Sequence, residues 1–271
     1  MSTVFRTRPG RPAMAFVSAV PIAVLGGLVG LGGAEFRLPV LVGLLGYPAR
    51  RAVPINLAVS VVTISAALLS RSRALSFAPI APFFPAILAL IAGAVTTALV
   101  GTALLHRLSD RRLEQLILTL LVVTGVALIV EGLVARKETG FLPTDTTVWI
   151  GAGLLFGLAI GLVSSLLGVA GGEVIIPTLV FAYGADIKTA GTASLLVSLP
   201  TVAVGIARYA RRGGYDRAAL AGTIAPMSAG SIVGAIIGGL LVGIAPASVL
   251  KIGLGVVLIV SATRTFARQR R

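Results

Sequence analysis

Two stretches of the chain carry the same unusual pattern: Gly30-Leu-Gly-Gly-Ala-Glu-Phe-Arg-Leu-Pro39 and Gly168-Val-Ala-Gly-Gly-Glu-Val-Ile-Ile-Pro177. Each places glycines before a glutamate and a proline four residues after it, inside a long apolar region. Glycine lets the backbone leave the helix and proline removes a backbone donor, so the pattern predicts a broken helix. At membrane depth, broken helices occur where they are buried in protein or line a cavity. We therefore expect both stretches to interrupt membrane helices.

The composition indicates a membrane protein. Of 271 residues, 56% are hydrophobic, 33 are glycine and only 12% are charged, and the mean hydropathy is +1.02. These values exclude a water-soluble globule, whose surface needs far more polar side chains. The sequence has no cysteine for disulfides or thiolate metal sites, and its single histidine leaves little for an imidazole metal cluster or Ser-His-Asp chemistry. It also has no phosphate-binding loop and no dinucleotide fingerprint, so we expect no metal and no cofactor.

Eight apolar stretches are long enough to cross a bilayer, and two more are too short. A crossing of about 30 Å needs roughly 20 residues of helix. Residues 35–46 and 172–184 provide only 12 and 13 residues, and we expect them to be broken or re-entrant pieces. The long stretches are 13–31, 52–70, 77–105, 113–135, 147–170, 189–207, 218–244 and 245–263.

A duplication relates the two halves of the chain. Writing residue i above residue i + 138 aligns residues 30–63 with 168–201 without a gap, with 12 identities in 34 positions. We therefore expect an all-α polytopic membrane protein in which residues 1–138 and 139–271 are repeats of five hydrophobic segments each, with one short broken helix in each repeat. Because five is odd, the second repeat is expected to be inverted. Membrane repeats of this kind are typical of transporters whose site lies at the repeat interface.

Basic residues set the expected orientation. The net charge is +14, from 23 basic and 9 acidic residues, and the arginines gather between the apolar stretches. The positive-inside rule predicts a multi-pass inner-membrane protein with both termini in the cytoplasm. Fusing each short piece with the preceding stretch gives eight crossings instead of ten, and the charges fit both counts. The pattern indicates a lipid bilayer as partner and no nucleic acid.

The two glutamates are the first candidates for chemistry. A charge in an apolar run costs at least a few kcal/mol, and burial favours the neutral carboxyl, which suits reversible protonation. We interpret Glu35 and Glu173 as proton-coupling residues that face each other near a pseudo-twofold axis. The alternative is that both are protonated carboxyls that cap the following half-helix or tie loops together.

Arg37 and two polar stripes complete the predicted site. The counterpart of Arg37 is Ile175, and its guanidinium is expected either to hold an anion or only to bridge helices. The stripes have helical spacing and are expected to line a cavity, unless their hydroxyls bond only their own backbone. They are Asn56, Ser60 and Thr63 in the first copy, and Ser194, Ser198 and Thr201 in the second. The predicted substrate-binding residues are Gly33, Ala34, Glu35, Arg37, Asn56, Ser60, Gly171, Gly172, Glu173, Ser194 and Ser198.

The duplicated glycine and proline motif, followed by a long helix with serine and threonine, resembles the sulfite exporter TauE/SafE family (the TSUP transporters). The resemblance covers nearly the whole chain, and it implies transport of sulfite, thiosulfate or a small organosulfonate with proton coupling. The family motif often has an apolar residue at the position of Glu35, so this chain departs from it there. The matching positions are Gly30, Gly32, Gly33 and Pro39 in the first copy, and Gly168, Gly171, Gly172 and Pro177 in the second.

The expected function is therefore a secondary transporter of a small anionic solute. The alternative is a carrier of a cation or a neutral metabolite, with the paired glutamates as ligands. A membrane enzyme or a structural subunit is least favoured, because the sequence offers no nucleophile and base set and its candidate site is duplicated. A comparison of anion binding with divalent-cation binding separates the first two functions.

Overall fold

The chain forms a helical bundle in the computed structural model, which describes residues 11–104, 119, 122–123, 125–130, 132–133, 140–167, 171–211 and 213–269. Within these residues there are helices and turns but no strand, which confirms the predicted all-α class. Most of the expected span 113–135 and Gly168 of the second motif lie outside the described residues. Five described helices are long and apolar enough to cross a membrane: Arg11–Val29, Arg51–Ala74, Ala78–Leu99, Ile187–Arg211 and Arg217–Leu241.

Each half begins with a long helix, a short helix, a π-helical turn and a second long helix, in that order. The first half contains α1 (Arg11–Val29), α2 (Ala34–Pro39), η1 (Val40–Leu44), α3 (Ala49–Ala74), η2 (Ala78–Phe83) and α4 (Phe84–Leu104). The second half contains α6 (Thr146–Leu167), α7 (Gly172–Pro177), η4 (Thr178–Ala182), α8 (Ile187–Arg211), α9 (Arg217–Ala219), η5 (Leu220–Ile224), α10 (Ala225–Leu241) and α11 (Ala247–Gln269). The sequence offset of 138 carries α2 onto α7 and η1 onto η4, residue for residue.

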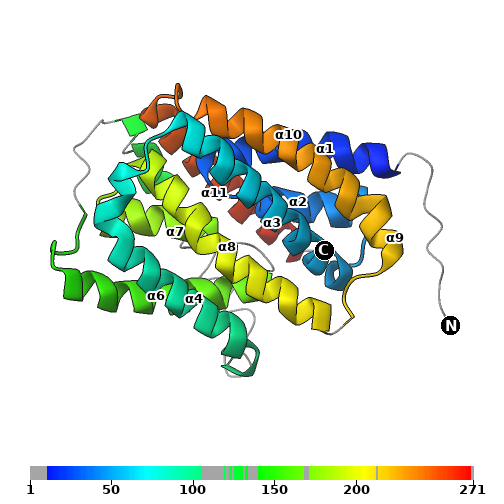
Figure 1. Ribbon diagram of the computed structural model, residues 1–271, viewed down its shortest axis with the longest axis horizontal. Helices are drawn as coiled ribbons and strands as arrows, with labels where there is room; N and C mark the ends of the chain where they lie inside the picture. Colours follow the sequence, from blue (N-terminus) through cyan, green and yellow to red (C-terminus); the bar gives the residue numbers. More distant parts are fainter. Residues whose placement is uncertain are drawn as a thin grey trace.

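Two helix pairs form opposite flanks of the bundle (Figure 1). α1 packs on α10 along one flank, and α4 packs on α6 along the other. Gly230 and Gly238 of α10 lie against the carbonyls of Phe16 and Val24, so close that a β-carbon on either glycine would overlap the facing oxygen. Such small residues let membrane helices approach closely. Because α1 is equivalent to α6 and α4 to α10, each pair joins one half of the chain to the other.

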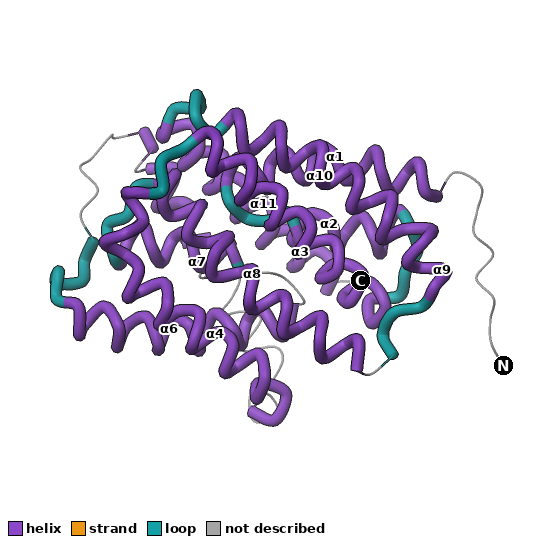
Figure 2. The backbone as a smooth tube through the Cα atoms, in the orientation of Figure 1, coloured by secondary structure: helices purple, strands orange, loops and turns teal. Residues whose placement is uncertain are grey.

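The helices α3 and α8 pass through the middle of the bundle (Figure 2). Their contacts show that they run antiparallel. Near one end, a β-carbon on Gly205 would lie 3.2 Å from the Leu57 side chain. Near the other end, Arg71 donates to the hydroxyl of Thr192 over 2.7 Å. These central helices carry the two polar stripes, which therefore lie inside the protein and away from lipid.

Arg71 holds the end of α1 against the start of α8. It is fully buried, and it donates to the carbonyl of Gly27 over 2.9 Å and to that of Leu28 over 2.8 Å. The last carbonyls of a helix have no helical partner and carry partial negative charge, so a guanidinium stabilises them. Together with its bond to Thr192, Arg71 fixes the point at which α1 stops.

Candidate functional site

Both helix breaks lie where the sequence predicts them. Gly33, before α2, has a φ of 74°, and Gly171, before α7, has a φ of 78°. A side chain would strain this left-handed backbone, which explains why both positions are glycine. After each short helix the chain widens into a π-helical turn, at Val40–Leu44 and Thr178–Ala182. The prolines at the junctions have no N–H to donate, so regular α-helical bonding cannot continue there.

The two breaks meet inside the bundle. A β-carbon on Gly172 would lie 3.1 Å from the Cα atom of Leu31, which belongs to the first break. Gly30 lies so close to Gly191 of α8 that a β-carbon on Gly30 would overlap the backbone of Gly191. The first break therefore packs against both the second break and the helix that follows it.

Glu35 and Glu173 occupy the first turns of α2 and α7. They are 9% and 7% exposed, and the two breaks that precede them pack against each other. Neither oxygen of Glu35 has a hydrogen-bond partner among the described residues. The structure thus buries both glutamates next to the point where the two breaks meet.

The guanidinium of Arg37 reaches the stripe on α3. Its Nη1 atom donates to the hydroxyl of Ser60 over 2.9 Å and to the side-chain oxygen of Asn56 over 3.3 Å. Its Nη2 atom donates to the hydroxyl of Thr63 over 2.8 Å and to the carbonyl of Gly32 over 3.3 Å. The side chain is completely buried. Of the two roles that the sequence left open for Arg37, these contacts are those of a bridge between helices.

The corresponding stripe on α8 has no such guanidinium, because Ile175 stands at the position equivalent to Arg37. Ser194 is fully buried, and its hydroxyl has no partner among the described residues. It lies beside the second break, since a β-carbon on Gly172 would be 3.2 Å from its Oγ atom. Ser198 is buried one turn further along, and Thr201 donates to its own helix.

Sequence reasoning missed Ser164 of α6. It is 5% exposed, and its hydroxyl also has no partner among the described residues. A β-carbon on Gly171 would overlap this hydroxyl, so Ser164 lies directly against the second break. Its counterpart 138 residues earlier is Gly26. A serine in an apolar helix forms no distinctive pattern, and only its alignment with Gly26 could have marked it.

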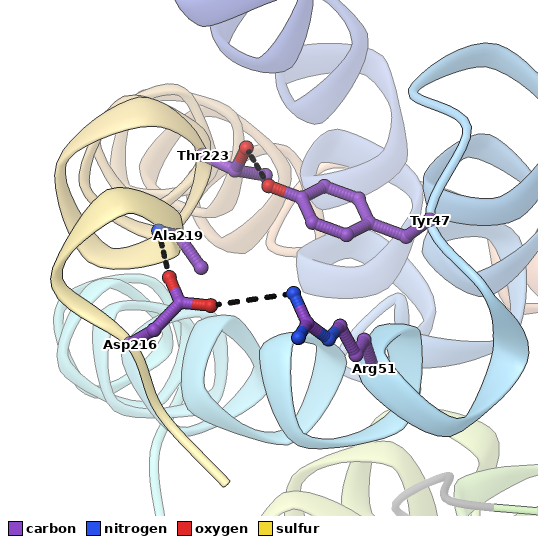
Figure 3. Close-up of polar contacts among 5 residues, drawn as sticks. All are labelled: Tyr47, Arg51, Asp216, Ala219 and Thr223. Atoms are coloured by element: carbon purple, nitrogen blue, oxygen red, sulfur yellow. Dashed lines mark hydrogen bonds and ion pairs between the residues drawn. The ribbon is translucent and has the colours of Figure 1, made fainter. Parts of the chain in front are cut away.

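A second polar cluster joins the two halves at one end of the bundle (Figure 3). The hydroxyls of Tyr47 and Thr223 are 2.7 Å apart, and Arg51 pairs with Asp216 at 3.6 Å. Asp216 also caps α9 by accepting from the backbone N–H of Ala219 over 2.5 Å. A shallow pocket lies among these residues. The sequence did not predict this cluster, because the residues equivalent to Tyr47 and Arg51 are Ala185 and Thr189, so the repeat shares no phenol and no charge there.

Two more side chains support this end of the bundle. Arg11 donates to the carbonyl of Leu45 over 2.6 Å and lies 4.2 Å from the centre of the Tyr47 ring. Tyr215 donates to the carbonyl of Pro54 over 3.2 Å. Burial raises the pKa of Tyr215 to about 12, so its phenol is a donor at neutral pH. The bond from Tyr215 to Pro54 is therefore kept at physiological pH.

Comparison with known proteins gives one match. A family model described as sulfite exporter TauE/SafE matches residues 2–128 and 153–271. The matched segments contain both helix breaks, both buried glutamates and both polar stripes. No curated protein and no solved structure matches the chain.

Proposed function

The chain belongs to the sulfite exporter TauE/SafE family, and we propose that it is a secondary transporter that couples a small sulfur-containing anion to protons. The anion classes are sulfite, thiosulfate and organosulfonates, and the proposal includes no enzymatic step. The observation that carries it is the meeting of two broken helices, each with a buried glutamate, between long apolar helices. Broken helices of this kind form the solute sites of many secondary transporters.

Alternating access follows in this proposal from two inverted repeats, residues 1–138 and 139–271. Two observations support the inversion: the equivalent helices α3 and α8 run antiparallel, and the flanking pairs join α1 to α10 and α4 to α6. One repeat then rocks against the other around a site near the midplane. Each repeat contributes five segments, including its broken helix.

The charges at one end of the bundle support an orientation. Arg11 begins α1, Arg51 lies in the first turn of α3, Arg211 ends α8 and Arg217 begins α9. The ends of α1, α3, α8 and α9 that carry these arginines lie towards the same end of the bundle (Figure 1). By the positive-inside rule, this end faces the cytoplasm, in the inner membrane. The second polar cluster then lies on the cytoplasmic side.

Proton coupling follows from the glutamate pair. A buried carboxyl without hydrogen-bond partners favours its neutral form, and the second carboxyl strengthens that preference. A solute anion that enters beside the pair adds further negative charge, so binding of the anion and binding of a proton favour each other. Arg37 contributes a fixed positive charge that attracts the anion while its terminal nitrogens keep their partners on α3.

The test is sulfite flux in proteoliposomes under an imposed pH gradient. The wild-type protein is expected to accumulate sulfite on the alkaline side, and the double variant Glu35→Gln with Glu173→Gln is expected to lose this dependence. Flux that ignores the gradient, or a double variant that still responds to it, contradicts the mechanism. Selective uptake of a divalent cation instead of sulfite contradicts the substrate class.

A further inference from the structure

Three of the positions at which the two halves differ decide which polar groups stand beside each break. In the first half, Arg37 and Asn56 are hydrogen-bonded within the protein, and Gly26 has no side chain. In the second half, the equivalent residues are one isoleucine and two serines. The equivalent pairs are Arg37 and Ile175, Gly26 and Ser164, and Asn56 and Ser194.

The first break is closed by internal contacts. Both terminal nitrogens of Arg37 donate to protein acceptors, so that its Nε atom alone has no partner among the described residues. One N–H group cannot form the bidentate contact by which arginine holds an oxyanion. Asn56 donates to the carbonyl of Ala34 over 3.0 Å. Gly26 leaves no room, since a β-carbon there would lie 2.8 Å from the backbone nitrogen of Gly33.

The second break is flanked by two buried hydroxyls. Ser164 lies against Gly171 and Ser194 lies against Gly172, so the two side chains border consecutive residues of one turn. Both serines are more than nine-tenths buried, and both hydroxyls lack a partner among the described residues. A buried hydroxyl without a partner is unfavourable, and an acceptor that reaches it recovers the lost hydrogen bond.

We propose that the oxyanion group of the solute accepts hydrogen bonds from Ser164 and Ser194, so that the anion contacts lie in the second half of the chain. The first half then holds the site in place, and the positive charge of its buried Arg37 attracts the anion. Sulfite, thiosulfate and sulfonates each present several oxygens on one sulfur atom, which suits two hydroxyl donors on either side of a turn. This inference rests on the proposed function, and it identifies the donors within that site.

The experiment is calorimetric titration of sulfite into the full-length protein in lipid nanodiscs. Ser164→Ala and Ser194→Ala are each expected to raise the Kd about tenfold, the effect of losing one hydrogen bond to an anion. Ser231→Ala is the matched control, because Ser231 of α10 is also fully buried with an unpartnered hydroxyl among the described residues. It is expected to leave the Kd within about twofold. The melting temperature without sulfite is expected to stay unchanged, since no existing bond is removed.

Two further variants repeat the binding test with residues that the chain itself carries at the equivalent positions. Ser164→Gly and Ser194→Asn introduce the residues that the first half carries at the equivalent positions. Both are expected to weaken binding as the alanine variants do, because glycine has no hydroxyl and the equivalent Asn56 donates its amide to the carbonyl of Ala34. If the wild type binds sulfite and all serine variants at 164 and 194 bind equally well, the inference is wrong and the proposed function stands. If the wild type binds neither sulfite nor thiosulfate, the proposed function fails, and the inference fails with it.

Discussion

The guanidinium of Arg37 donates to the hydroxyl of Thr63 over 2.8 Å, and this bond ties the first broken helix to the long helix α3 behind it. A second bond, to Ser60 over 2.9 Å, fixes the orientation of the guanidinium plane. Because the side chain is fully buried, its charge is held in one place within the protein. The first broken helix is thus fixed to α3 through Arg37, so a variant of Arg37 can be tested for stability and for solute binding separately.

Arg37→Lys is expected to lower the free energy of unfolding by about 1–3 kcal/mol. A lysine ammonium lacks the planar fork, so it cannot reach acceptors on both α3 and the Gly32 carbonyl at once. Thermal and SDS unfolding of the purified protein measures the change. The sulfite Kd is expected to change much less than in the variants of Ser164 or Ser194. A variant of normal stability that no longer binds sulfite would show that Arg37 contacts the solute.

Glu35→Gln is expected to lower sulfite uptake driven by a pH gradient at least tenfold, while the melting temperature stays the same or rises. Uptake falls because the neutral amide cannot accept a proton. The melting temperature does not fall because the substitution replaces a buried carboxyl that has no hydrogen-bond partner among the described residues. Asp145→Asn is the control, since this exposed carboxylate caps α6 far along the chain from both breaks. Equal losses in both variants would show that the effect of Glu35→Gln is not specific to the site.

Gly30→Ala is expected to destabilise the protein by more than about 2 kcal/mol. Its φ is 98°, which disfavours any β-carbon, and the added atom would overlap the backbone of Gly191. In the control Gly253→Ala, a β-carbon meets nothing within 4 Å, and the substitution is expected to be neutral or to stabilise α11 by up to about 1 kcal/mol. Unfolding by SDS compares the two variants. Equal stability would show that the first break does not pack against α8 as described.

Asp216→Ala and Asp216→Asn separate the two roles of this side chain. Alanine removes both the helix cap and the ion pair with Arg51, and it is expected to cost about 1 kcal/mol. Asparagine keeps a capping oxygen and removes only the charge, and it is expected to cost less than about 0.5 kcal/mol because the pair is half-exposed. If asparagine costs as much as alanine, the ion pair and not the cap holds the second polar cluster together.

Sequence repeats predicted the local structure well and the contacts between segments less well. The offset of 138, found from identities such as Glu35 with Glu173, also relates the bounds of α2 and α7, because glycine and proline fix the backbone locally. The sequence could not predict that Arg37 bonds to Ser60 and Thr63. Helical spacing places these two residues on one face of a helix, but it does not indicate which other segment packs against that face. The approach of Ser164 to Gly171 depends on the packing of α6 against the break, which no local pattern encodes.

The most direct test of the central claim is the movement of protons when a sulfite gradient alone is imposed on proteoliposomes that contain a trapped pH-sensitive dye. The account predicts that sulfite entry carries protons inward in the wild type, and that Glu35→Gln with Glu173→Gln abolishes this acidification. Sulfite entry at the wild-type rate with no change of internal pH would contradict the account, because the paired carboxyls would then have no part in transport.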